Sequence, residues 1–196
     1  MSYYLKGSRF IFNDECPPIA PGEILSRLGL PKELTEKGKV RKAFESVKKE
    51  ASELIHMAAA AAYFKMPDRS IPPIPTGTEV VGAIITIGAD ISRKSDEYFA
   101  RGKYTKGMIL NEIADHCLSV YEKMIIERLE VLSDRKGVIL GRMYESPDEM
   151  PFSELNYVWN AVGAGGSIGV NVTRDSTLSP IKSSCLIMKI KYPTVG

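Results

Sequence analysis

A long apolar stripe between about Thr105 and Leu132 is the feature that most constrains the fold of this chain. Its apolar residues recur at intervals of three and four, as on one face of a helix. One row consists of Ile109, Ile113, Cys117, Val120 and Met124, and a second row of Leu110, Ala114, Leu118, Tyr121, Ile125 and Leu129 widens it. A stripe this wide predicts a helix that is buried over most of its girth, so other elements must surround it.

Strands are predicted on both sides of this helix in the sequence. The run Val80 to Ile87 is dominated by Val and Ile and is closed by Gly88, which predicts a central strand buried on both faces. Leu186 to Tyr192 alternates apolar and other residues, which predicts a strand with one buried and one solvated face. Shorter strands are expected at Tyr3 to Phe12, Val138 to Tyr144 and Ile168 to Thr173.

Further helices are expected at Glu23 to Leu28, Asp90 to Ala100 and Ser153 to Val162. One more carries the stripe Val40, Phe44, Val47, Ala51, Leu54, Ile55 and Ala58. The segment Gly163 to Gly169 is interpreted as a flexible helix-to-strand connection. Residues 1–196 are expected to form a single α+β domain, with an N-terminal helical part (about 1–66), an internal linker rich in Pro and Gly, and a core at about 78–192.

Composition excludes several classes of partner. With 26 basic and 24 acidic side chains the net charge is +2, too balanced for binding a nucleic-acid backbone. No segment approaches the roughly 20 apolar residues of a membrane span, and no secretory signal is visible, so a cytoplasmic location is expected. The three cysteines, Cys16, Cys117 and Cys185, are far apart in the sequence and match neither a disulfide framework nor a paired-thiolate metal site.

Motifs that suggest catalysis fail on their context. Gly165 to Gly169 matches the Gly-x-Ser-x-Gly pattern of a hydrolase, but its glycines leave a helix and enter a strand, and both histidines precede Ser167. A dinucleotide fingerprint is excluded because Ile168 stands where its third glycine belongs. His56 and His116 are too few for most metal triads. No catalytic residue and no metal ligand is therefore assigned.

Three segments in order resemble the activation domain of cobalamin-dependent methionine synthase and its free-standing relatives, between about Val80 and Ile190. The first is VVGAIITIGADISRKSDEYFARGKYTKGMILNEIADHCLSVYEKMIIERL, the second is GRMYESPDEMPFSEL, and the third is IGVNVTRDSTLSPIKSSCLIMKI. The resemblance implies a mainly antiparallel twisted sheet with long packed helices. It also implies binding of S-adenosylmethionine next to a corrinoid, whose cobalt receives the methyl group during reductive reactivation.

The resemblance indicates which residues would bind the cofactor. Arg142 stands where the family has its ligand-binding arginine, and Tyr144 and Pro147 belong to the same loop. Ser119 stands where the family has a ligand-contacting glutamate, and Glu122 lies one helical turn later. Thr173 belongs to a threonine-containing turn.

Two features depart from the family pattern. The family's Pro-Gly-Tyr is replaced by Pro147-Asp148-Glu149, which removes a close backbone approach and an aromatic ring. The cobalt-ligating Asp-x-His-x-x-Gly is absent, so cobalamin would be carried only by a partner protein. Purely structural roles stay open: Arg142 pairs with a carboxylate across the sheet, Tyr144 is a half-buried strand aromatic, and Thr173 satisfies a turn.

The expected function is that of an S-adenosylmethionine-binding activation-type protein acting on a corrinoid protein or cobalamin-dependent methyltransferase. The alternative is a non-catalytic docking module for the same partner that has lost cofactor binding. Whether the chain is itself an enzyme, and its oligomeric state, are not specified by the residues.

Overall fold

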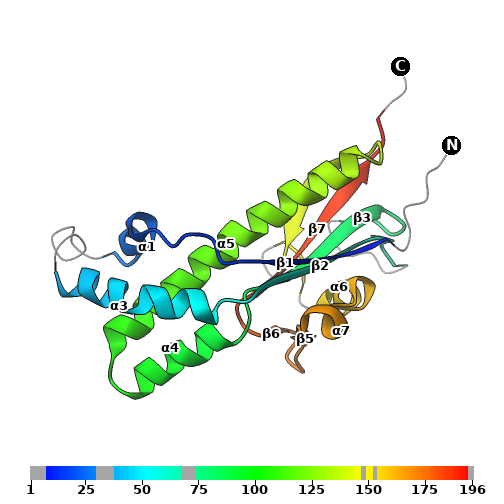
Figure 1. The fold of residues 1–196 in the computed structure, drawn as a ribbon. Coiled ribbons are helices and arrows are strands. Elements are labelled where there is room, and N and C mark those ends of the chain that lie inside the picture. Colours follow the sequence, from blue (N-terminus) through cyan, green and yellow to red (C-terminus); the bar gives the residue numbers. More distant parts are fainter. Residues whose placement is uncertain (1–7, 30–37, 68–73, 147–148, 152–153, 194–196) are drawn as a thin grey trace.

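The protein is described by a computed structural model that covers residues 8–29, 38–67, 74–146, 149–151 and 154–193. A five-stranded antiparallel sheet forms its centre, in the order β1-β2-β3-β7-β4 (Figure 1). Its strands are β1 (Arg9–Asp14), β2 (Met57–Lys65), β3 (Glu79–Thr86), β4 (Ile139–Glu145) and β7 (Ser183–Lys191). A short hairpin of β5 (Asn171–Val172) and β6 (Leu178–Ser179) forms a separate two-stranded sheet.

Helices cover both faces of the sheet. They are α1 (Pro21–Arg27), α3 (Lys39–Leu54), α4 (Asp90–Ala100), α5 (Tyr104–Asp134), α6 (Leu155–Val162) and α7 (Ala164–Ile168). Figure 1 shows α5 along one face and α6 with α7 on the other, while α3 and α4 pack beside the part of α5 that extends past the sheet. The predicted α+β class, with an antiparallel sheet and long packed helices, is confirmed.

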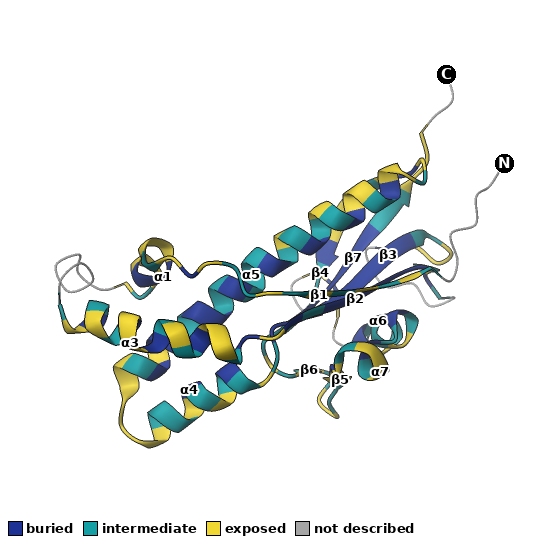
Figure 2. Ribbon diagram, in the orientation of Figure 1, coloured by how far each residue is buried: buried dark blue, intermediate teal, exposed yellow. Residues whose placement is uncertain are grey.

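Each face of the sheet has its own apolar core. The α5 face buries Val81, Ala83 and Ile85 of β3 against α5, and the opposite face buries Val80 and Ile84 against α6. From Val80 to Thr86 every residue of β3 is therefore buried, as predicted for the central strand (Figure 2).

The long helix begins and ends within two residues of its predicted bounds. The C-terminal half of the helix is buried on fewer sides than predicted. Tyr121, Ile125 and Leu129 are fully buried there, but Lys123 and Glu127 are exposed. There the sheet alone covers the helix, whereas α1, α3 and α4 add contacts to the N-terminal half. None of the described helices is both long and apolar enough to cross a membrane.

Strand β2 was missed by the sequence pattern, which extended the preceding helix to Ala58. The helix α3 ends at Leu54 because Ile55 is extended, with ψ of 120°, and the His56 amide then donates to the Ile87 carbonyl at 2.9 Å. The alanine-rich run Met57–Lys65 pairs with β1 on one side and β3 on the other. The N-terminal part thus contributes two strands to the sheet as well as helices.

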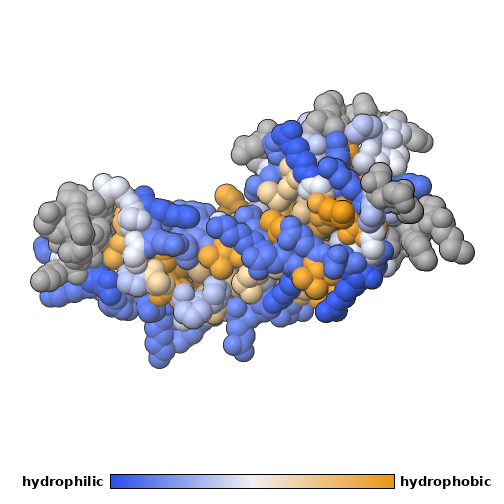
Figure 3. Space-filling view, turned by 90° about the horizontal axis from the view of Figure 1, so that it is seen from above, coloured by the Kyte–Doolittle hydropathy of each residue, from blue (hydrophilic) through white to orange (hydrophobic). Residues whose placement is uncertain are grey.

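Two further expectations were wrong. The glycine-rich connection contains the short helix α7, bounded by Gly163 and Gly169 with φ of 72° and 70°, a left-handed conformation that glycine adopts without steric strain. Strand β7 is buried on both faces from Ser184 to Met188, because the α6 side covers the face that was expected to be solvated. The outer surface seen from above is mainly hydrophilic, with small separate hydrophobic patches (Figure 3).

Candidate functional site

The candidate site lies at the β4 edge of the sheet, where Arg142 and Tyr144 occupy alternate positions of one strand. Tyr144 is 4% exposed and belongs to the core on the α6 face. The Arg142 guanidinium carbon lies 5.1 Å from the Tyr144 ring centroid, and Lys189 Nζ of the neighbouring strand lies 5.2 Å from it. Two cations thus flank one buried aromatic ring, an arrangement that suits cation–π contact.

Arg142 is held by a carboxylate but remains open to solvent. Its side chain is 66% exposed, and Nη2 donates a short hydrogen bond to Oε1 of Glu149. That hydrogen bond, with the charge of Glu149, raises the pKa of Arg142, so the guanidinium stays charged. The structural alternative for Arg142 was a carboxylate partner across the sheet. The carboxylate that it pairs with belongs instead to Glu149, in the loop that follows β4.

The loop after β4 is fixed by its own backbone. The amides of Glu149 and Met150 both donate to the Glu145 carbonyl, at 2.9 and 3.1 Å, and the Met150 side chain is buried. Ser146 donates its amide to the Cys185 carbonyl of β7 at 3.1 Å. Pro147 lies outside the described residues.

A small cavity of about 160 Å³ opens beside this loop. It lies between the end of β4, the start of α6, the β5–β6 hairpin and the start of β7, and is lined by Ser146, Leu155, Thr177, Leu178, Ile181, Ser183, Ser184 and Cys185. Its walls combine hydroxyl groups with apolar side chains. The hydroxyl groups suit hydrogen bonds to a ligand's hydroxyls, and the apolar side chains suit contact with a ligand's ring. Typical cofactor pockets measure about 300–1,000 Å³, so this cavity would hold only part of a nucleoside-sized ligand.

Thr173 belongs to the turn of the β5–β6 hairpin. Its hydroxyl accepts a hydrogen bond from the Thr177 amide at 3.2 Å and lies 2.8 Å from the Thr177 hydroxyl. The Thr173 amide donates in turn to the Thr177 carbonyl at 2.8 Å. The hydrogen bonds of Thr173 therefore stabilise the turn. Thr173 is connected to the cavity through Thr177, which is one of the lining residues.

Glu122 lies on the opposite side of the sheet from Tyr144. It projects from α5, and burial raises its carboxyl pKa, while the nearby Ser184 hydroxyl partly offsets the rise. Ser184 precedes Leu186 and Met188 on the face of β7 that packs against α5. Tyr144 instead shares the α6 face with Ile187, so the sheet separates Glu122 from the Arg142–Tyr144 pair.

The same side of α5 carries other polar groups near the start of β7. Asp115 accepts a hydrogen bond from Asn111 at 3.1 Å and forms an ion pair with Lys182, which directly precedes β7. Ser119, one turn further along, is half-buried. The predicted residues therefore form two groups: Arg142 and Tyr144 at the edge of one face, and Ser119 and Glu122 on the helix over the other.

Sequence reasoning missed the loop carboxylate and the serine-rich cavity. Glu149 is seven positions from its partner Arg142 and lies beyond the end of β4, so the periodicity of the strand does not indicate the contact. Ser183 comes close to Ser146 only because β7 returns beside β4 from the far end of the chain. The signal in the sequence that could have indicated this cavity was the pair Ser183 and Ser184 at the start of β7.

One comparison with known proteins, that with solved structures, supports the fold. No family model matches the chain, and no curated protein matches it in sequence. Among solved structures, the chain is similar to one described as the crystal structure of the MetH reactivation domain bound to AdoHcy, with a TM-score of 0.65 and 10% sequence identity. The likeness covers 97% of this chain and 80% of that one. The resemblance seen in the sequence is thus confirmed at the level of the fold.

Proposed function

We propose that the chain is an S-adenosylmethionine-binding protein of the activation type, which supports reductive methylation of the cobalt in a corrinoid partner. The observation that carries this proposal is the charged, solvent-exposed Arg142, seated over the Tyr144 ring at the edge strand of a fold shared with an AdoHcy-bound domain. S-adenosylmethionine supplies the methyl group in such a reaction. The corrinoid belongs to a separate corrinoid protein or cobalamin-dependent methyltransferase.

The residues at the edge fit one end of this ligand. The planar guanidinium of Arg142 can pair with the ligand carboxylate through two parallel hydrogen bonds. The hydroxyls of Ser146, Thr177 and Ser183 around the cavity suit a ribose. Because the cavity is small, most of the ligand would lie along the exposed edge of the sheet.

Glu149 competes with the ligand in this arrangement. Its carboxylate occupies the same guanidinium that the ligand carboxylate would use, so binding exchanges one partner of Arg142 for another. We therefore expect Glu149→Gln, which keeps the shape but removes the charge, to increase the affinity. Arg142→Ala should raise the Kd by about 5- to 100-fold, the usual range for losing a charge-assisted hydrogen-bonded pair.

Calorimetric titration with S-adenosylmethionine tests these expectations. Arg93→Ala is the matched control, since Arg93 is an exposed arginine paired with Asp90 at 2.9 Å on the distant helix α4. Saturable binding that weakens in Arg142→Ala, strengthens in Glu149→Gln and is unchanged in Arg93→Ala supports the proposal. Equal affinity in all four proteins would refute the site.

A second candidate function is a docking module without cofactor. The observation that favours it is the Arg142–Glu149 ion pair, which satisfies the arginine internally at the position where the family motif is altered. No heat at millimolar S-adenosylmethionine, in both the wild type and Glu149→Gln, would favour this alternative. Co-purification with a corrinoid-carrying methyltransferase would then be the next measurement.

A further inference from the structure

The outer edge of β1 lacks the features that usually prevent a strand from pairing with another chain. β1 is an outer strand of the sheet, and β2 is its one pairing partner within the described residues. Its register with β2 is regular along the whole strand, and residues 10–13 are uncharged. Bulges, prolines and charged side chains normally block pairing at such edges. The edge of β1 is therefore open to a further strand.

The opposite edge of the same sheet is protected. The register of β4 with β7 shifts between Leu140 and Met143, and the strand carries the charged residues Arg142 and Glu145. An irregular register bends an edge away from a flat pairing surface. Of the two outer strands, β1 is thus the one with a regular edge.

The backbone groups on the free edge of β1 belong to alternate residues. The Tyr63 amide donates to the Ser8 carbonyl at 3.3 Å, which shows where the hydrogen-bonded pairs of the β1–β2 ladder lie. Such pairs recur at every second residue. Arg9, Ile11 and Asn13 lie between them, so their amides and carbonyls point away from β2. All three residues are exposed (Figure 2).

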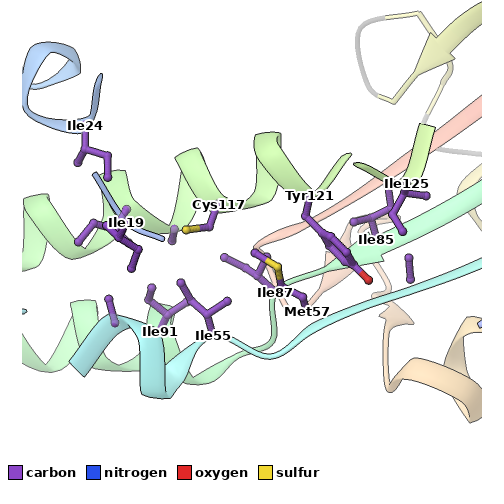
Figure 4. Close-up of a cluster of buried hydrophobic side chains, with 14 of the residues drawn as sticks. Ile19, Ile24, Ile55, Met57, Ile85, Ile87, Ile91, Cys117, Tyr121 and Ile125 are labelled. Carbon is purple, nitrogen blue, oxygen red and sulfur yellow. The ribbon is translucent and has the colours of Figure 1, made fainter. Parts of the chain in front are cut away.

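Contacts with α5 hold β1 in place on one face. Figure 4 shows Tyr121 projecting from α5, and its hydroxyl donates to Asp14 Oδ2 at 3.0 Å. Arg128 donates to the same carboxylate at 2.6 and 2.7 Å. The edge is therefore already ordered as a strand before any partner arrives, which lowers the entropic cost of pairing.

We propose that β1 pairs antiparallel with β1 of a second copy of this chain, which joins two five-stranded sheets into one continuous sheet. An antiparallel pair of identical strands has two-fold symmetry, as most homodimers do. With Ile11 opposite Ile11 of the second copy, Arg9 lies opposite Asn13. In this register all the outward amides and carbonyls of these three residues find partners.

The side chains are complementary in the same register. Phe10 and Phe12, which pack against the core on the α5 face, lie opposite Phe12 and Phe10 of the second copy as aromatic pairs. Ile11, which is 45% exposed in one chain, is covered by its own copy. Within residues 8–14 no like charges lie opposite each other, so the strand matches itself without repulsion.

The charges at the ends of β1 also match. Ser8 lies opposite Asp14 of the second copy, and Lys136 Nζ donates to the Ser8 hydroxyl at 3.2 Å. The Lys136 ammonium is thereby brought toward the Asp14 carboxylate of the other chain. Sliding the strands by two residues would set Phe10 opposite Asp14, or Ser8 opposite Phe12, and would lose this match.

The dimer does not depend on the proposed cofactor site. β4 stays the outer strand at both ends of the joined sheet, so Arg142 remains at a free edge in each copy. Loss of cofactor binding would leave the dimer unchanged, and loss of the dimer would leave cofactor binding unchanged.

Sedimentation velocity of the full chain over a concentration series tests the proposal. The wild type should be a dimer at high micromolar concentration. Ile11→Lys sets two lysines opposite each other and should raise the dimer Kd by about tenfold or more. Ile139→Lys is the matched control, because Ile139 is the 56% exposed isoleucine of the other outer strand, and its Kd should equal that of the wild type.

Amide hydrogen exchange of the wild type gives a readout that does not need a variant to fold. The Ile11 and Asn13 amides should be protected at high concentration and should lose this protection on dilution. A wild type that stays monomeric, or a dimer whose Ile11 and Asn13 amides exchange as fast as in the monomer, would overturn the proposal. A folded Ile11→Lys variant with an unchanged Kd would overturn it as well.

Discussion

Replacing Asp14 with asparagine should destabilise the protein, because Asp14 ties the edge strand β1 to α5. Its carboxylate accepts two hydrogen bonds from Arg128, at 2.6 and 2.7 Å, and one from the Tyr121 hydroxyl at 3.0 Å. The asparagine oxygen can still accept from Tyr121, so the loss falls mainly on the paired contact with Arg128.

The size of the effect follows from burial. A hydrogen bond to a charged group contributes about 1.5–3 kcal/mol, but the Arg128 side chain is 39% exposed, and water screens an exposed pair to about 1 kcal/mol or less. We expect Asp14→Asn to lower the free energy of unfolding by about 1–2 kcal/mol. For a chain of this size the melting temperature would fall by roughly 2–8 °C.

The effect should depend on pH with a defined sign. Hydrogen bonds from Arg128 are the largest cause of the lowered pKa of Asp14 in the folded protein. A lowered folded-state pKa means that the stabilisation is fully present above the unfolded-state value of about 3.9, and is lost as the pH falls through the folded-state value. The difference between wild type and variant should therefore shrink in acid.

Urea unfolding of the wild type, Asp14→Asn, Arg128→Met and the double variant measures this coupling at neutral pH and at a series of lower pH values. The two single changes should be non-additive, because each removes the same contact. Strictly additive effects, or a difference that persists unchanged into acid, would refute the reasoning.

Two more substitutions test the packing of β2 and β3. Gly82→Ala should lower the free energy of unfolding by about 1–3 kcal/mol, because its Cβ would lie 2.8 Å from Cε1 of Phe64, whereas Gly166→Ala has no atom within 4 Å and should be close to neutral in thermal melts. Tyr63→Phe should lower the free energy of unfolding by about 1–2 kcal/mol, because the substitution leaves the buried Ser133 hydroxyl without its 2.8 Å partner. Chemical denaturation measures this loss, and an unchanged unfolding midpoint would contradict the prediction.

Elements with strong periodicity were predictable from the sequence. The helix Asp90–Ala100 was predicted with its observed bounds, and β3 was predicted as the central strand, because a short run dominated by Val and Ile favours a strand covered on both faces. Strand β2 was not predicted, since alanine favours helices and Ala58 continues the helical stripe of α3. Pairing with β1 and β3 overrides that preference, and the absence of any charge between His56 and Lys65 was the signal available for it.

The site was predictable only in part. In a regular strand Arg142 and Tyr144, two positions apart, share a face, but β4 has an irregular register between Leu140 and Met143 that the sequence pattern does not indicate. The placement of Glu122 across the sheet depends on which face of β7 packs on α5. Such long-range geometry leaves no trace in local spacing.

The strand order has a consequence for synthesis on the ribosome. The centre of the sheet is completed by β7, and Ser183 meets Thr86 of β3 across 97 residues. Because synthesis proceeds at about 5–20 residues per second, one side of β3 would stay unpaired for roughly 5–20 s before β7 is made. An open edge on a mainly apolar strand invites pairing with other chains, so this interval is where we expect nascent chains to depend on chaperones. Arrested chains that end before β7 should therefore bind holdase chaperones, whereas release of those chains without chaperone contact would contradict this expectation.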